Sequence, residues 1–260
     1  MNWQFFVRKR NRSLTFFATL VLGLSLAATY WPGRRANSPA VLLLHGNGSS
    51  RKSTAPNAAW LASLGFATLT IDFRGHGQSS GASHSFGLYE ARDARAAFEW
   101  LKRTQNGAPV AIIGNSLGGA AILLGDGGPL LADALVLDAV YPDIRHAIRN
   151  RIASMITIGP ASVLEPLLSF QSRLRFGVWP SRLSPLSALR RYPGPVFIVG
   201  GAADRFTPLS ETRAMFEAAP GPKTLWLAPG EDHAHVADLA TADYRERLLG
   251  FLRETIGSPD

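Results

Sequence analysis

Short apolar runs alternate with longer amphipathic segments along most of the chain. Six apolar runs predict strands, at residues 40–45, 66–71, 109–114, 134–138, 195–200 and 223–228. The segments between and after them predict helices, near residues 53–64, 87–104, 116–125, 208–219 and 241–256. Strands that are apolar throughout and alternate with helices are typical of a parallel sheet covered on both faces. The pattern therefore predicts an α/β fold with one mostly parallel sheet of about six strands.

The N-terminal region has a different pattern. Residues 14–31 carry no charge, follow a basic cluster at residues 8–12, and as a helix would span roughly 27 Å, enough for a bilayer core. We expect a transmembrane anchor there, with a cleaved signal segment and secretion as the alternative. Because basic residues are denser before the segment than after it, the domain that follows is expected on the extracytoplasmic side, periplasmic if the source is bacterial. The predicted division is residues 1–35 as N-terminus and residues 36–260 as a catalytic domain.

Net charge narrows the range of partners. Six of the 27 basic residues lie in residues 1–35, so residues 36–260 carry 21 basic against 19 acidic side chains. This near-neutral balance, without a basic and aromatic motif, argues against nucleic-acid binding. The charge inside the domain is uneven, because residues 141–191 hold eight arginines beside apolar clusters and only two acidic residues. We expect a helical cap there that lines an acyl pocket and faces anionic head groups. The absence of cysteine is neutral on the redox compartment.

Candidate chemistry begins at residues 114–119, which read Gly-Asn-Ser-Leu-Gly-Gly directly after a predicted strand. A serine between two glycines at a strand-to-helix turn is typical of a nucleophile elbow, where only small residues fit two positions away. This makes Ser116 the candidate nucleophile. The following helix begins beneath it and favours developing negative charge.

A serine hydroxyl is a poor nucleophile unless an imidazole takes its proton and a carboxylate orients that imidazole. Asp204 follows the strand run that ends near residue 200, and His233 follows the last strand run. Each has a competitor. Asp138 ends the strand at residues 134–138, and His235 lies two positions after His233. We favour Asp204 as the acid and His233 as the base.

A tetrahedral intermediate also needs hydrogen-bond donors for its oxyanion. Residues 45–48 read His-Gly-Asn-Gly after the first predicted strand, and a backbone N–H of Asn47 or Gly48 could act together with that of Leu117. His45 is expected to shape this loop from the strand end rather than to take part in catalysis.

Together these segments resemble the serine hydrolases of the α/β-hydrolase superfamily over about residues 40–256. The motifs fall in the family's order, at residues 45–48, 72–81, 114–119, 204–208 and 230–233. The resemblance implies structural roles for Arg74 and His76 in the loop at 72–81. One departure is that few residues precede the His-Gly strand, so the leading strands of the family are expected to be missing. The strand at 66–71 would then lie near a sheet edge that needs covering or pairing.

The expected reaction is hydrolysis of a carboxylic ester or thioester through an acyl-enzyme, with a small-molecule or lipid-like acyl ester as substrate. It needs no cofactor, and the histidines and carboxylates lack the spacing of a metal site. Peptide hydrolysis and acyl transfer to another acceptor stay open as alternatives. A membrane-tethered binding protein without turnover is the alternative from another class, because a fold alone does not imply function.

Overall fold

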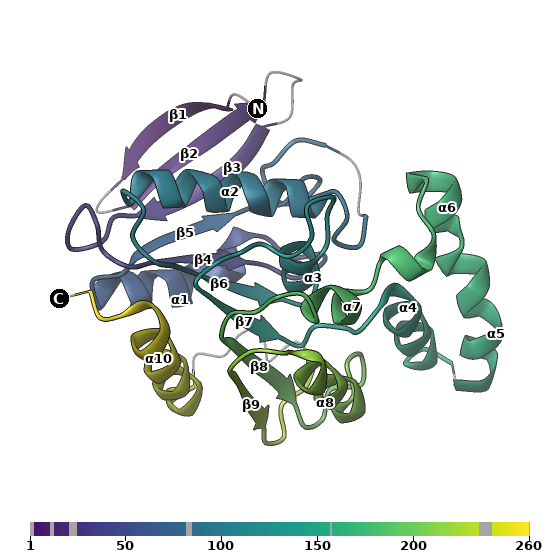
Figure 1. Ribbon diagram of the computed structural model, residues 1–260. Helices are drawn as coiled ribbons and strands as arrows, with labels where there is room; N and C mark the ends of the chain where they lie inside the picture. The colour runs from purple at the N-terminus through teal and green to yellow at the C-terminus, as the bar shows by residue number, and fades with distance from the viewer. Residues whose placement is uncertain are drawn as a thin grey trace.

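The described part of the chain builds one nine-stranded sheet in the order β1-β2-β3-β5-β4-β6-β7-β8-β9 (Figure 1). The structure is a computed structural model, and it describes residues 3–10, 13–20, 25–81, 85–156, 158–233 and 241–259. The strands are β1 (Trp3–Arg10), β2 (Ser13–Leu20), β3 (Ser25–Trp31), β4 (Ala40–Leu44), β5 (Ala67–Ile71), β6 (Val110–Asn115), β7 (Ala134–Asp138), β8 (Val196–Gly201) and β9 (Lys223–Ala228).

The six strands predicted from apolar runs are confirmed as β4 to β9, and the pairings among these six strands are all parallel. Every residue of β4, β5, β7 and β8 is buried, which explains why these strands are apolar rather than alternating. Their side chains divide between two cores. Leu42 packs into the core on one face of the sheet, whereas Val41 and Leu43 pack into the core on the other.

Helices cover both faces of the sheet, as predicted. The helices that follow the parallel strands are α1 (Arg51–Ser63), α2 (Glu90–Thr104), α3 (Leu117–Leu123), α8 (Leu209–Ala218) and α10 (Ala242–Ile256). Leu61 of α1 and Leu248 of α10 belong to one core, whereas Leu101 of α2 and Met215 of α8 belong to the other. The carboxyl ends of the parallel strands therefore meet at one sheet edge, where ligands bind in folds of this kind.

The prediction of a helix at residues 14–31 is wrong for the residues that the structure describes, since they form β2 and β3. The prediction that the leading strands are missing is also wrong, because β1, β2 and β3 precede β4. Residues 21–24 lie outside the described ranges. β3 pairs antiparallel with β5, with Tyr30 opposite Leu69, and covers the edge that the six-strand prediction left open. Freedom from charge does not separate one long helix from two short strands, and Thr29, Tyr30 and Trp31 are types that favour strands.

No helix in the described ranges is long and apolar enough to cross a membrane. The predicted anchor therefore has no support in the structure. The extracytoplasmic location, which was inferred from that anchor, stays a prediction.

The insertion predicted at residues 141–191 is helical. It contains α4 (Ile144–Ala153), α5 (Ile158–Ser169), α6 (Gln171–Phe176), a short 3-10 helix η1 (Pro180–Arg182) and α7 (Pro185–Leu189). Asp143 caps the first of these helices, because its carboxylate accepts from the His146 N–H at 3.0 Å. Figure 1 shows α5 and α6 projecting to one side of the body, beyond α4.

Candidate active site

Ser116 lies at the sharp turn between β6 and α3. Its backbone has φ 46° and ψ −106°, a conformation that L-residues rarely adopt and that costs on the order of 1–3 kcal/mol. Two backbone hydrogen bonds hold the turn, from Ser116 N–H to Asp138 O at 2.8 Å and from Ala120 N–H to Ser116 O at 3.0 Å. The side chain is buried except at the cavity that it lines.

The glycines of this turn are required by close contacts rather than by flexibility. A Cβ on Gly118 would clash with the carbonyl oxygen of Leu44, and one on Gly114 would lie 2.5 Å from Ile122 Cδ1. Since neither the strand nor the helix can move away without disrupting the core, both positions exclude larger residues. These contacts give the Gly-x-Ser-x-Gly pattern its physical basis in this chain.

Asp204 and His233, on the loops after β8 and β9, form a hydrogen-bonded pair. The His233 Nδ1–H donates to Asp204 Oδ2 at 2.8 Å. The other carboxylate oxygen accepts from the Phe206 and Thr207 N–H groups at 2.7 and 2.9 Å, and the Thr207 hydroxyl also donates to Asp204. Burial raises the pKa of Asp204, but the bonds from His233 and Thr207 outweigh it and leave the pKa below its ordinary value. Asp204 is therefore an ionised carboxylate that orients the imidazole.

Two cavities meet at Ser116. The first, about 200 Å³, is mainly apolar, with Phe86, Tyr141, Ala147, Ile148, Ile152 and Leu168 on its wall. The second, about 350 Å³, has several polar side chains on its wall, namely Ser49, Ser53, Thr54 and Asn115, and we call it the polar cavity for this reason. Both are lined by Asn47, Ser116, Arg151, Phe206 and His233. The structure thus brings the sequence-predicted serine and histidine to one shared cavity wall.

The backbone N–H groups of Asn47 and Leu117, which the sequence suggests as oxyanion donors, have no acceptor among the described residues. Leu117 is the first residue of α3, where helix geometry leaves the N–H without a partner inside the helix. The Gly48 N–H, the alternative from the sequence, instead donates to His76 Nε2 at 3.3 Å. On the loop after β4, the N–H of Asn47 rather than that of Gly48 is therefore without a described acceptor.

His45 is buried in the loop that carries Asn47. Its Nδ1–H donates to the Gly46 carbonyl at 2.8 Å, and its Nε2 accepts from the Phe73 N–H at 3.1 Å. Burial lowers the pKa of His45 to about 4, so the ring is neutral at physiological pH. Both nitrogens are occupied by the backbone, which fits the predicted role of shaping the loop.

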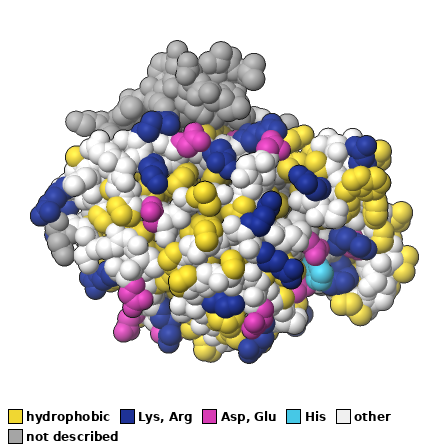
Figure 2. All heavy atoms as spheres, viewed as in Figure 1, with side chains coloured by type: hydrophobic (Ala, Val, Ile, Leu, Met, Phe, Trp, Pro, Cys, Tyr) yellow, Lys and Arg dark blue, Asp and Glu magenta, His cyan; other side chains and the backbone are white. Residues whose placement is uncertain are grey.

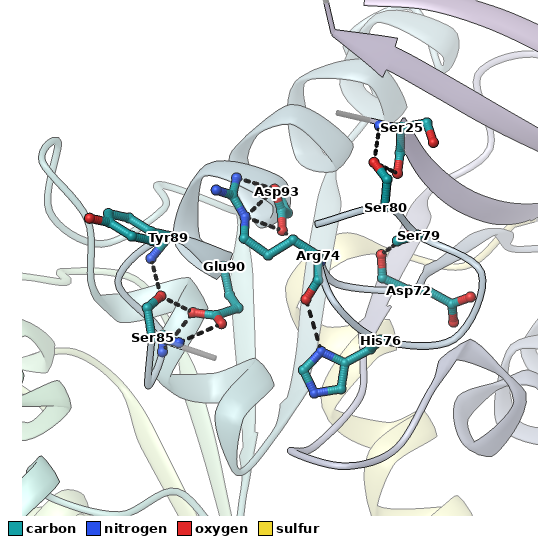
Figure 3. Close-up of polar contacts among 11 residues, drawn as sticks. Ser25, Asp72, Arg74, His76, Ser79, Ser80, Ser85, Tyr89, Glu90 and Asp93 are labelled. Atoms are coloured by element: carbon teal, nitrogen blue, oxygen red, sulfur yellow. Dashed lines mark hydrogen bonds and ion pairs between the residues drawn. The ribbon is translucent and has the colours of Figure 1, made fainter. Parts of the chain in front are cut away.

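Polar contacts hold the loop at residues 72–81 against α2 and the start of β3 (Figure 3). Arg74 reaches Asp93 on α2 through a two-oxygen ion pair, and its carbonyl accepts from His76 Nδ1 at 3.0 Å. Ser80 exchanges hydrogen bonds with Ser25 at the start of β3. These contacts agree with the structural roles that the resemblance implied for Arg74 and His76.

The two candidate acids, Asp204 and Asp138, make different contacts. Asp138 is fully buried beneath the site, where its Oδ2 accepts from the Tyr244 hydroxyl at 3.0 Å, whereas His233 is bonded to Asp204. His235 lies outside the described residues. Within those residues, no group of three His, Asp or Glu side chains is placed to hold a metal ion.

Sequence reasoning missed Arg151 and Phe206 as cavity residues. In the sequence Arg151 is one of several cap arginines. Its spacing alone does not show that α4 packs beside the cavities at the sheet edge. The Asn150 side chain holds α4 in this position, because it donates to the Phe206 carbonyl at 3.0 Å and to Glu211 at 2.7 Å. One feature of the sequence could have indicated Arg151. This arginine interrupts the apolar face of the helix that directly follows the loop after β7.

Comparison with known proteins places the chain in a family. Residues 35–173 match the family described as serine aminopeptidase, S33. The uncharacterised protein YqkD of Bacillus subtilis is 30% identical over 192 residues, which cover 73% of this chain and 63% of YqkD. Lysophosphatidylserine lipase ABHD12 of Danio rerio is 32% identical over 138 residues, covering 50% of this chain and 35% of ABHD12. The chain therefore spans less than two thirds of the length of either relative.

Solved structures share the architecture at low sequence identity. The esterase Pf2001 of Pyrococcus furiosus superposes with a TM-score of 0.70 at 20% identity, covering 98% of this chain and 94% of that one. The architecture is the α/β-hydrolase fold, as expected from the sequence.

Proposed function

The chain belongs to the serine aminopeptidase S33 family, and on that premise we propose that it is a serine hydrolase that cleaves carboxylic esters of amphiphilic molecules. One observation carries the proposal. His233 is oriented by Asp204 through the 2.8 Å Nδ1–Oδ2 bond and lines the same cavity as Ser116. A carboxylate-oriented imidazole on the cavity wall that carries the serine supports activation of the serine hydroxyl by that imidazole.

In the proposed mechanism, His233 Nε2 takes the hydroxyl proton as Ser116 Oγ attacks the ester carbonyl carbon. The carbonyl oxygen becomes an oxyanion that accepts from the Asn47 and Leu117 N–H groups. The intermediate then collapses with cleavage of the ester bond, and His233 returns the proton to the leaving alcohol. Water repeats these steps on the acyl-enzyme and releases the acid. Asp204 keeps the proton on Nδ1 throughout and stabilises the imidazolium.

The two cavities support an amphiphilic substrate. An acyl chain suits the apolar cavity that contains Ile148 and Ile152, whereas the alcohol portion suits the polar cavity. Arg151 lies between them, and no acidic side chain of the described residues is within ion-pair distance of it. An anionic group on the alcohol portion would meet this guanidinium.

An aminopeptidase is the second candidate, because the family's description favours it. Such an enzyme binds a cationic α-ammonium group, for which an acidic side chain is the expected partner. Of the described residues that line either cavity none is acidic, and Arg151 is the one arginine or lysine among them. The electrostatics therefore favour an anionic substrate over a peptide N-terminus.

Parallel assays separate the two candidates. We expect the purified protein to hydrolyse p-nitrophenyl octanoate and to leave aminoacyl p-nitroanilides intact. Ser116→Ala should reduce ester turnover by about 10³-fold or more, because the nucleophile is lost. Ser63→Ala, an exposed serine at the end of α1, is the matched control and should keep full activity. Hydrolysis of anilides in preference to esters would contradict the ester assignment and support the aminopeptidase.

A further inference from the structure

The helix α5 has its polar and apolar faces reversed. The residues that it buries are Ala161, Glu165 and Ser169, one small and two polar. Val163 and Leu167 instead lie in solvent, with 73% and 69% of their surfaces exposed. A surface helix normally buries its apolar stripe, so this helix presents that stripe to something outside the fold.

The apolar surface continues beyond α5. Eleven large apolar side chains are exposed in the described part of the chain, and ten of them fall within residues 155–179. Among them are Met155, Phe170, Leu174 and Trp179. Figure 2 shows yellow apolar side chains gathered over the projecting lobe that holds α5 and α6. We call this set of exposed residues in 155–179 the cap surface.

Cationic side chains are mixed with the apolar ones. Arg173 and Arg175 are exposed within the cap surface, and Arg182 is exposed just beyond it. No carboxylate of the described residues is within ion-pair distance of these three arginines. The two acidic residues of the cap are already engaged, because Glu165 pairs with Arg145 at 3.0 Å and Asp143 caps α4. The cap surface therefore carries a net positive charge.

The cap surface also adjoins the proposed active site. Leu168, which belongs to it, lines the apolar cavity together with Ser116. Leu168 therefore joins the exposed apolar residues of the cap to the wall of the apolar cavity.

We propose that the cap surface docks on an anionic lipid bilayer, with Leu167, Leu174 and Trp179 inserted into the headgroup region and the arginines facing the phosphates. Charge complementarity supports an anionic bilayer as the partner. Amphipathic helices bind such membranes by inserting their apolar side chains while their basic side chains contact the anionic lipids. Tryptophan is also enriched at membrane interfaces. A second copy of the chain fits less well, because a two-fold interface would bring the same arginines together.

A fluorophore at a single position tests the proposal locally. The chain has no cysteine, so Leu174→Cys can be labelled alone with an environment-sensitive NBD dye in the full-length protein. Leu174 is 88% exposed, so the change leaves the core intact. Upon addition of phosphatidylcholine vesicles containing phosphatidylglycerol, we expect at least about a twofold rise in emission with a blue shift, as insertion predicts. Vesicles of pure phosphatidylcholine, or anionic vesicles at high salt, should give a much smaller change.

Leu131→Cys provides the matched control. Leu131 is 68% exposed and lies outside the cap, so dye at this position should not respond to the same vesicles. Because the readout is local, binding of the membrane by another part of the chain would not mimic it. An unchanged emission from the dye at position 174 or an equal response from the dye at position 131 would overturn the proposal. A rise in emission at position 174 with increasing protein concentration and no vesicles would also overturn it. Catalysis plays no part in this test, so its result is independent of the proposed reaction.

Discussion

The guanidinium of Arg151 lies over the ring of Phe206, with its carbon 4.3 Å from the ring centre. The same ring lies nearly perpendicular to the imidazole of His233, with 5.2 Å between the ring centres. A cation on the cap and the imidazole at the site are therefore held on one aromatic side chain. A substrate anion bound by Arg151 would therefore lie one aromatic ring away from the imidazole of His233.

Replacing Arg151 should reduce activity selectively toward anionic esters. Arg151→Gln removes a charge-assisted contact worth about 1.5–3 kcal/mol, so kcat/KM should fall about 10- to 100-fold for octanoyl lysophosphatidic acid. Turnover of octanoyl monoacylglycerol, which lacks the phosphate, should change little. Initial rates with both substrates measure this difference. Arg103→Gln on α2 is the control, and equal losses on the two substrates would refute the assignment.

Filling the apolar cavity should shorten the preferred acyl chain. Ala147 lines this cavity from α4, so Ala147→Phe would place a ring where the chain is expected to lie. We expect kcat/KM for decanoyl esters to fall about tenfold or more relative to acetyl esters, since overpacking costs about 1–3 kcal/mol. Ile152→Ala should shift the preference toward longer chains. The measurement is a chain-length series of p-nitrophenyl esters, and an unchanged profile in both variants would count against this cavity as the acyl site.

The glycine two positions after Ser116 should not tolerate a methyl group. Alanine normally stabilises a helix relative to glycine by up to about 1 kcal/mol. Gly118→Ala should instead lower the free energy of unfolding by about 1–3 kcal/mol, because the new Cβ would clash with Leu44 O. Gly250→Ala is the matched control in α10, where a Cβ would have no other atom within 4 Å, and it should stabilise. Urea unfolding of both variants tests the contrast, and a fully stable Gly118→Ala would disprove the predicted clash.

Asp138 should make stability depend on pH. Burial raises its pKa to about 7, against the hydrogen bond from Tyr244. Between about pH 4 and about pH 7 the folded protein then binds a proton that the unfolded chain has lost, so the free energy of unfolding falls as pH rises. Asp138→Asn removes this titrating group. As pH rises from about 4 to about 8, the free energy of unfolding of the variant should therefore increase by roughly 2–4 kcal/mol relative to that of wild type.

Urea unfolding of wild type and Asp138→Asn at the two pH values measures that gain. Asp126→Asn, at a largely exposed position, is the control and should unfold at the same urea concentration as wild type at both pH values. Parallel pH profiles for wild type and Asp138→Asn would contradict the raised pKa.

The central sheet was predictable because its strands are buried on both faces. Runs such as residues 40–44 and 134–138 have no polar face and therefore stand out from the helical pattern. The N-terminal strands were not predictable in the same way. Residues 25–31 belong to a strand because β5 offers an unpaired edge, and a charge-free run does not record that partner.

Local motifs likewise predicted the loop residues of the candidate site better than its cavities. Ser116 and Gly118 follow from the steric demands of one tight turn, which a short pattern encodes. Arg151 reaches the site only because Asn150 fastens α4 to the Phe206 loop across more than fifty residues of sequence. Contacts over that separation leave no local pattern, so the cation of the site became visible only in the structure.

Covalent labelling tests the central claim that Ser116 is a nucleophile activated by His233. Wild-type protein and His235→Ala should react with a fluorophosphonate probe at Ser116, as read by peptide mass spectrometry. Ser116→Ala should not react, and His233→Ala should react at least about 100-fold more slowly, because its general base is missing. An unlabelled wild type, labelling at another residue, or a His233→Ala variant that reacts at the wild-type rate would contradict the account.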